Sequence, residues 1–297
     1  MKIMINIIIF FLAKYGSIFY NTFIGCDAME SIINLDNVSY SVFKRNILNN
    51  ISLSIKKGEF VSGIGGNGSG KSTLINVLAG IVDYSGYIDI NGYCLNKENI
   101  NNIRKSVSVV FDDINNVNVT ENVSDEIAVG LNNLGIDEFS ISKMVVDIAR
   151  EFKIYNILNY DFASISNSNK VKVFLASALV SNPDILIIDD CLHQLSVSDK
   201  ELIFDILNKY NKKKKLTIIM VTHDVNDTLN SNRVIVLSKG MIVFDGTPRS
   251  VFKNKDKLID CGIEIPFMML LSLKLMDEGV INHVYVDMRK LVDDIWK

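Results

Sequence analysis

The sequence is poor in several features that define other protein classes. It has 4 cysteines and 3 histidines in 297 residues. The cysteines (Cys26, Cys94, Cys191 and Cys261) form no CxxC pair, so we expect reduced thiols rather than disulfides or a zinc site. Neither charge dominates, because 31 basic residues balance 34 acidic ones to a net charge of -3. This balance gives no global field to recruit nucleic acid, and we expect no nucleic-acid partner.

Long apolar runs are also missing. At the amino terminus the longest unbroken run is Ile7 to Ala13, far short of the about 20 residues that a spanning helix needs. A signal peptide and a membrane-surface anchor are two interpretations of this segment. Because Met29 opens a natural domain start, we favour a third: residues 1–28 are an upstream extension that is disordered or not translated.

Short apolar runs predict an α/β fold. "FVSGI", "VSVVF", "DILIID", "LTIIMV" and "RVIVL" are typical of buried parallel strands, and helical patterns separate them. "ISLSI" alternates as a half-buried strand, and "GYIDINGYCL" predicts a hairpin that turns at Asn91 and Gly92. We therefore expect a mostly parallel sheet flanked by a small antiparallel subdomain.

Two further segments are predicted to be helical. No strand candidate lies between Val123 and Asn182, where apolar residues fall at helical spacing, so an inserted helical subdomain is expected at about residues 115–182. After Pro248 an apolar helical tail follows, which is too short to span a bilayer. The lysine run 212–215 follows a helix and is interpreted as a solvated cap.

The segment 63–74, "GIGGNGSGKSTL", carries the strongest functional signal. Its spacing fits a P-loop between a strand and a helix, the context that a nucleoside triphosphate site requires. Glycines allow backbone amides to approach phosphate, Lys71 offers a charge, and the Ser72 hydroxyl suits Mg²⁺. The predicted nucleotide-binding residues are Gly65, Gly66, Asn67, Gly68, Ser69, Gly70, Lys71, Ser72 and Thr73.

A second metal ligand is expected at the end of a neighbouring strand. Asp189 closes the apolar run "ILIID", and in a parallel sheet the carboxyl ends of strands meet at one edge. The carboxylate can then hold Mg²⁺ through water, together with Ser72. The cofactors predicted from these motifs are ATP and Mg²⁺.

From Met29 onward the sequence resembles ABC-transporter ATPases, in particular the ATP-binding subunits of energy-coupling factor transporters. The resemblance is carried by "NISLSIKKGEFVSGIGGNGSGKSTL", "VFDDINNVNVTENVSDEIAVGLNNLG", "MVTHDVNDTLNSNRVIVLSKGMIVFDGTP" and "VFKNKDKLIDCGIEIPFMMLLSLKLMDEG". It implies an ATP-binding domain at residues 29–248 and a family-specific extension at 249–297. It also implies a peripheral protein on the cytoplasmic face of the cell membrane. Its partners would be a second ATP-binding subunit, a transmembrane coupling subunit and a substrate-binding membrane subunit.

The resemblance also assigns roles to single residues. His223 matches the histidine that contacts the γ-phosphate. Asp112 stands where the family has the Q-loop glutamine, and Asp190 where it has the catalytic glutamate, a side chain shorter by roughly 1.5 Å. The partner-facing signature reads Ile165 to Asn169: its Ser166 is retained and can cap a helix, whereas Asn167 and Ser168 replace glycines.

Three functions are compatible with these residues. The first is the ATPase subunit of an energy-coupling factor transporter that drives uptake of a vitamin or trace metal, with slow hydrolysis. The second is a catalytically degenerate, non-hydrolysing regulatory subunit paired with an active paralogue. The third, a soluble P-loop ATPase that acts on DNA or ribosomes, is disfavoured because the chain has neither a coiled-coil insertion nor a second nucleotide domain.

Overall fold

The computed structural model describes residues 31–43, 45–112, 120–132, 135–285 and 288–296, so the expected extension at 1–28 lies outside the described residues. The strands are β1 (Ser31–Val42), β2 (Arg45–Lys56), β3 (Phe60–Ile64), β4 (Ser85–Ile90), β5 (Tyr93–Cys94), β6 (Val107–Val110), β7 (Ile185–Asp189), β8 (Thr217–Val221), β9 (Arg233–Ser238) and β10 (Met241–Gly246). The α-helices are α2 (Lys71–Leu78), α3 (Ile100–Arg104), α4 (Val123–Asn132), α5 (Glu138–Glu151), α6 (Asn167–Val180), α7 (Val197–Lys214), α8 (Pro248–Phe252), α9 (Lys255–Asp260), α10 (Phe267–Asp277) and α11 (Met288–Ile295). Short 3₁₀ helices are η2 (Tyr155–Ile157), η3 (Phe162–Ser164), η4 (Cys191–Gln194) and η5 (Val225–Asn230).

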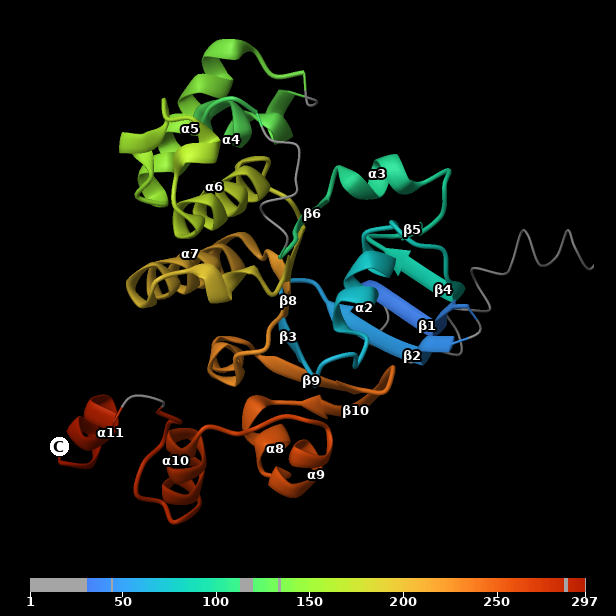
Figure 1. Cartoon of the computed structure of the whole chain (residues 1–297), viewed down its shortest axis with the longest axis vertical. Coiled ribbons are helices and arrows are strands. Elements are labelled where there is room, and N and C mark those ends of the chain that lie inside the picture. The colour runs from blue at the N-terminus through green and yellow to red at the C-terminus, as the bar shows by residue number, and fades with distance from the viewer. Residues whose placement is uncertain (1–30, 44, 113–119, 133–134, 286–287, 297) are drawn as a thin grey trace, which may run out of the picture.

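The larger sheet has six strands in the order β10-β9-β3-β8-β7-β6. Its strands pair in parallel except at the β10 edge, which the sequence analysis did not predict. The apolar runs are buried because helices cover one face and the second sheet with α2 covers the other (Figure 1). Successive residues of β7 accordingly face opposite sides of the sheet. Ile188 belongs to the apolar core under the helices, and Ile187 to the core under α2 and the antiparallel sheet.

The smaller sheet is antiparallel, with the order β2-β1-β4-β5. Asn91 and Gly92 both have positive φ, at 53° and 81°, which is the turn conformation that the Asn-Gly pair predicts for the hairpin of β4 and β5. The predicted antiparallel subdomain is therefore confirmed.

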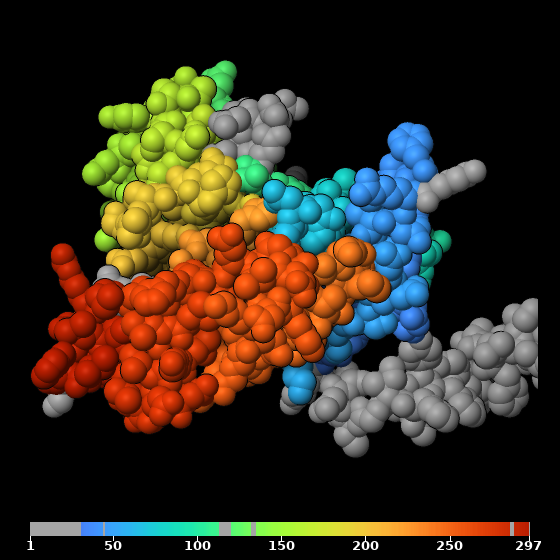
Figure 2. All heavy atoms as spheres, turned by 60° about the horizontal axis from the view of Figure 1, so that its bottom comes forward, coloured from blue at the N-terminus to red at the C-terminus, as the bar shows by residue number. Residues whose placement is uncertain are grey.

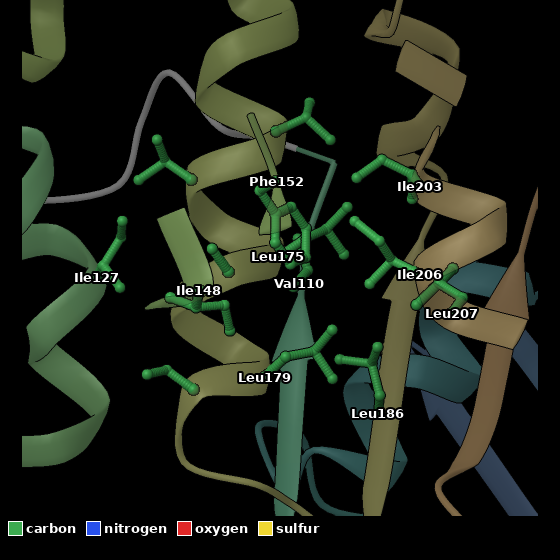
Figure 3. Close-up of a cluster of buried hydrophobic side chains, with 14 of the residues drawn as sticks. Val110, Ile127, Ile148, Phe152, Leu175, Leu179, Leu186, Ile203, Ile206 and Leu207 are labelled. Carbon is green, nitrogen blue, oxygen red and sulfur yellow. The ribbon is translucent and has the colours of Figure 1, made fainter. Parts of the chain in front are cut away.

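Helices α4, α5 and α6 form the predicted helical insertion, seen beside α7 at the upper left of Figure 1. Figure 3 shows how their apolar side chains meet: Leu175 and Leu179 of α6 lie between Ile148 of α5 and Leu186 of β7. The three lysines 212–214 form the last turn of α7 and Lys215 is its C-cap, so the run ends this helix rather than follows it.

The tail packs against the outer part of the larger sheet. Ile64 and Val236 share a buried cluster with Phe252, Leu258 and Met269 of helices α8 to α10, and Figure 2 shows these helices as a continuous orange and red surface. No helix in the described part of the chain has the length and apolarity needed to cross a bilayer.

Candidate functional site

The register of the larger sheet brings three loops to one edge. Val221 at the end of β8 pairs with Gly63 of β3 on one side and with Asp189 of β7 on the other. The segments that follow these strands carry the P-loop, Asp190 and His223. Residues from three distant parts of the sequence therefore meet at the carboxyl edge of the sheet, where α/β proteins bind their ligands.

Lys71 lies at the centre of the P-loop. Its side chain is buried, and its Nζ donates to the carbonyl oxygens of Gly65 at 2.7 Å and Gly66 at 3.1 Å. Burial is the largest effect and lowers the pKa of Lys71, while Asp190 and Asp189 raise it. The ammonium is thus the central cation of a loop built to hold an anion.

Gly70 shows why this loop needs glycine. It is the N-cap of α2 with φ 106°, a left-handed conformation that side chains rarely adopt. A Cβ there would also lie 2.9 Å from Cδ2 of Leu48. The helix can begin directly at Lys71, with its first N–H groups at the loop, because Gly70 allows this sharp entry.

Ser72 and Asp189 lie together as predicted for a metal site. The Ser72 Oγ donates to Asp189 Oδ1 at 3.2 Å, and Asp189 is 5% exposed. Burial raises the pKa of Asp189, the Ser72 hydrogen bond lowers it, and the neighbouring carboxylates of Asp190 and Asp112 raise it further. Hydroxyl and carboxylate oxygens with excess negative charge are what Mg²⁺ prefers, so these residues fit the ion.

We expect Asp189→Asn to raise the melting temperature of the nucleotide-free protein at neutral pH. The amide keeps the acceptor for Ser72 but removes a charge whose burial is unfavourable. Each kcal/mol regained corresponds to about 2–4 °C in a protein of this size class.

Differential scanning calorimetry without nucleotide measures the effect. Asp184→Asn, at the other end of β7 and with a side chain 42% exposed, is the matched control. A lower melting temperature for Asp189→Asn would contradict the electrostatic interpretation.

Asp190 and His223 form a tight pair. The carboxylate accepts from the backbone N–H of His223 at 3.0 Å through Oδ1, and its Oδ2 lies 3.2 Å from His223 Nε2. Asp190 has φ 50°, a strained value for a residue with a side chain and one that clusters at functional sites. Both oxygens of the expected catalytic carboxylate are therefore occupied within its own chain.

Asp112 has an amide partner that the sequence analysis did not find. Gln194 Nε2 donates to the backbone oxygen of Asp112 at 3.0 Å and to its Oδ1 at 3.2 Å, and His193 Nδ1 is 3.7 Å from Oδ1. Position 112 has a carboxylate where the related sequences have a glutamine amide, and the side-chain amide of Gln194, in η4, lies beside it. No local pattern marks Gln194, because its partner is 82 residues away.

The signature segment begins α6 as expected. Ser166 caps this helix, with its Oγ accepting from the N–H of Asn169 at 3.3 Å. Asn167 is exposed, whereas the Ser168 hydroxyl turns toward α7 and donates to Asp199. Of the two side chains that replace glycines, that of Asn167 is therefore exposed and that of Ser168 is directed toward α7. None of the hydrogen bonds between described residues joins 166–168 to the P-loop of the same chain.

The tail reaches the P-loop directly. The N–H of Gly66 donates to the carbonyl oxygen of Cys261 at 3.2 Å, and a Cβ at Gly66 would lie 2.8 Å from that oxygen. In this conformation the Gly66 amide, expected to face phosphate, is held by the segment after α9. We name this hydrogen bond the tail contact.

The family resemblance implies an aromatic ring near position 42 that stacks on the adenine base. Val42 is 36% exposed, Tyr40 packs against the core of the antiparallel sheet, and Phe43 is fully exposed with φ 46°. Tyr40 is thus committed to packing, and Phe43 is the available aromatic near position 42.

Known proteins resemble this chain over most of its length. Residues 48–193 match the ABC transporter family. The energy-coupling factor transporter ATP-binding protein EcfA of Enterococcus faecium is 33% identical over 273 residues, which cover 90% of this chain and 98% of the relative. EcfA1 of Ligilactobacillus salivarius (strain UCC118) is 34% identical over 267 residues, 89% of this chain and 95% of the relative.

Solved structures agree with this relationship. CbiO1 from Clostridium perfringens superimposes with a TM-score of 0.69 at 27% identity, over 84% of this chain and 99% of that one. A dimeric ATP-binding cassette bound to ADP and phosphate superimposes with a TM-score of 0.68 at 25% identity, over 73% of this chain and 98% of that one.

The P-loop, the acidic strand end and the inserted helices define an ATP-binding cassette of the ABC transporter class. Within that class, the chain belongs to the family of energy-coupling factor transporter ATP-binding proteins. The predicted fold and the family resemblance are both confirmed.

Proposed function

We propose that this chain couples ATP binding and slow hydrolysis to the uptake of a vitamin or trace metal. It works as one of two ATP-binding subunits, a second copy or a paralogue, at the cytoplasmic face of the membrane. A transmembrane coupling subunit and a substrate-binding membrane subunit complete the transporter. The names of its relatives support this, as does CbiO1, which is described as part of an ABC transporter complex.

The single observation that carries the proposal is the convergence of Lys71, Ser72, Asp189, Asp190 and His223 at one sheet edge. In this function Lys71 binds the outer phosphates, and Ser72 and Asp189 would hold Mg²⁺, which offsets phosphate charge when bound. In the same function Asp190 would act on the attacking water, and His223 would contact the γ-phosphate. Because His223 holds both oxygens of the short Asp190 side chain, we infer that turnover is slow.

Isothermal titration calorimetry with Mg-ATP tests the binding step, and co-purification of the membrane subunits tests the assembly. Binding of ATP together with recovery of a transmembrane subunit supports the proposal. Absence of any heat of ATP binding would refute it.

An apolar groove beside Asp112 is the surface that we assign to the transmembrane subunit. It lies between the end of α2, helix α3 and strand β6, and its lining includes Leu78, Ile81, Ile100, Ile103, Val109 and Phe111. Ile81 is 57% exposed at this groove. An apolar groove of this kind accepts the apolar face of a short helix.

Ile81→Glu is expected to weaken co-purification of the transmembrane subunit at least about tenfold, since a charge would be buried in an apolar contact. The affinity for ATP, measured by calorimetry, should stay within error because Ile81 follows the carboxyl end of α2, whereas Lys71 begins this helix. Phe139→Glu is the control: this side chain is 82% exposed on α5. Equal losses for both variants would mean that the groove has no special role.

The second candidate is a non-hydrolysing regulatory subunit, and the engaged carboxylate of Asp190 favours it. Transport assays with Asp190→Asn separate the two functions. Unchanged transport, with assembly lost in Lys71→Ala, supports the regulatory function; loss of transport supports an ATPase.

A further inference from the structure

The signature helix is tied to the start of α7 through one carboxylate. Ser168 Oγ donates to Asp199 Oδ2 at 2.6 Å, and Lys172 Nζ lies 3.0 Å from Asp199 Oδ1. Asp199 also donates its backbone N–H to the Ser196 Oγ, which caps α7, at 3.2 Å. The carboxylate of Asp199 therefore binds Ser168 of the signature and Lys172, a lysine one turn further along α6. Its backbone N–H binds the residue that caps α7.

This arrangement is largely removed from water. The Lys172 side chain is 7% exposed and that of Asp199 is 24% exposed. Burial raises the pKa of Asp199, but the hydrogen bonds from Ser168 and Lys172 outweigh it, so the pKa is lower than usual. The carboxylate is charged at neutral pH, and each of its oxygens has a donor.

The Ser168 hydroxyl is oriented by this acid at 2.6 Å and, at the longer distance of 3.5 Å, by the backbone N–H of Ser196, which donates to Ser168 Oγ. A hydroxyl can rotate toward any nearby acceptor, and here a charged acceptor on α7 fixes it toward the interior of its own chain. Where the related signature sequence has a glycine, a freely rotating serine would place an extra polar atom against a ligand held by another subunit. Asp199 keeps that atom on the inner side of α6.

We propose that Asp199 is a positioning residue for the signature of this chain, because it holds the Ser168 side chain away from the nucleotide bound by the partner subunit. The inference rests on the proposed function, in which two ATP-binding subunits close around ATP. It goes beyond that function by assigning a task to a residue outside the signature and the P-loop. Asp199 acts through Ser168 and touches no phosphate itself.

A double-mutant cycle on the full chain tests the assignment. Sedimentation velocity measures Mg-ATP-dependent association of two copies of the chain. Asp199→Ala is expected to weaken association about tenfold, a typical coupling between residues in contact. The Ser168→Gly background has no hydroxyl at position 168. There the Asp199→Ala substitution should change the association constant less than about threefold relative to Ser168→Gly alone.

Thermal stability separates positioning from a merely structural role. Removing Asp199 leaves the Lys172 ammonium buried without this partner in both backgrounds, so the melting temperature should fall in both. If Ser168→Gly restores the association of the Asp199→Ala variant but does not restore its melting temperature, the positioning role is supported. Should Asp199→Ala not fold, Lys172→Met with Asp199→Ala removes the stranded charge and enters the same cycle.

The control is Asp205→Asn, which removes a charge from an exposed position on the same helix and should leave association unchanged. Equal weakening by Asp199→Ala with and without Ser168 overturns the inference alone. Tighter association after Asp199→Ala also overturns it, since the acid would then act by repelling phosphate. If the unmodified chain binds Mg-ATP but two copies do not associate, the cycle is run with the co-expressed paralogue. No ATP-driven association with either partner overturns the proposed function and this inference together.

Discussion

Lys71→Ala is expected to weaken Mg-ATP binding at least about 100-fold. Truncating a buried, hydrogen-bonded charge costs about 2–5 kcal/mol, and about 2.7 kcal/mol corresponds to this change in affinity. Lys71 is 6% exposed and bonded to two loop carbonyls. Its loss leaves Asp189 and Asp190 as a negative cluster that repels the phosphates.

Isothermal titration calorimetry of the full chain measures this loss directly. Lys57→Ala is the matched control, because Lys57 has a side chain 57% exposed and a 3.6 Å ion pair with Asp184; surface pairs of this kind contribute little. An affinity for ATP that survives truncation of Lys71 would contradict the whole assignment of the P-loop.

Asp190→Glu is expected to raise the rate of ATP hydrolysis by about 10- to 100-fold. A misplacement of about 1 Å at a reacting centre costs about 100-fold, and the longer side chain recovers that reach. It also shifts the carboxylate away from the two His223 contacts, at 3.0 and 3.2 Å, that occupy Asp190. Asp190→Asn should instead abolish residual turnover and leave ATP binding in place.

Phosphate release from the purified complex, under saturating Mg-ATP, measures turnover for both variants. Asp184→Glu makes the same substitution at the opposite end of β7 and should leave the rate unchanged. If Asp190→Glu hydrolyses ATP no faster than the unmodified chain, the length of this side chain does not limit turnover. The regulatory function would then be favoured.

The sequence predicted the elements of the nucleotide site because their signals are local. A P-loop needs a strand, a glycine turn and a helix within a short segment, and β3, Gly70 and α2 follow in that order. Asp189 was predictable for the same reason, since a carboxylate that ends a buried strand must lie at the sheet edge.

The missed residues act across long sequence separations. Gln194 reaches Asp112 over 82 residues, and Asp199 reaches Ser168 over 31. Whether such polar side chains meet depends on how η4 and α7 pack against the rest of the fold, which hydrophobic periodicity does not specify. The strand β10 was missed for a different reason: it lies at the edge of the sheet, where alternate residues stay exposed and the apolar signal is weak.

The tail contact has a consequence for synthesis. Cys261, the acceptor for the Gly66 amide, is made long after the P-loop in translation. Chains fold from the amino terminus as they are made, so the P-loop is made before its tail contact can form. A ribosome-bound intermediate that lacks Cys261 would therefore present the Gly66 amide to phosphate before the tail can occupy it.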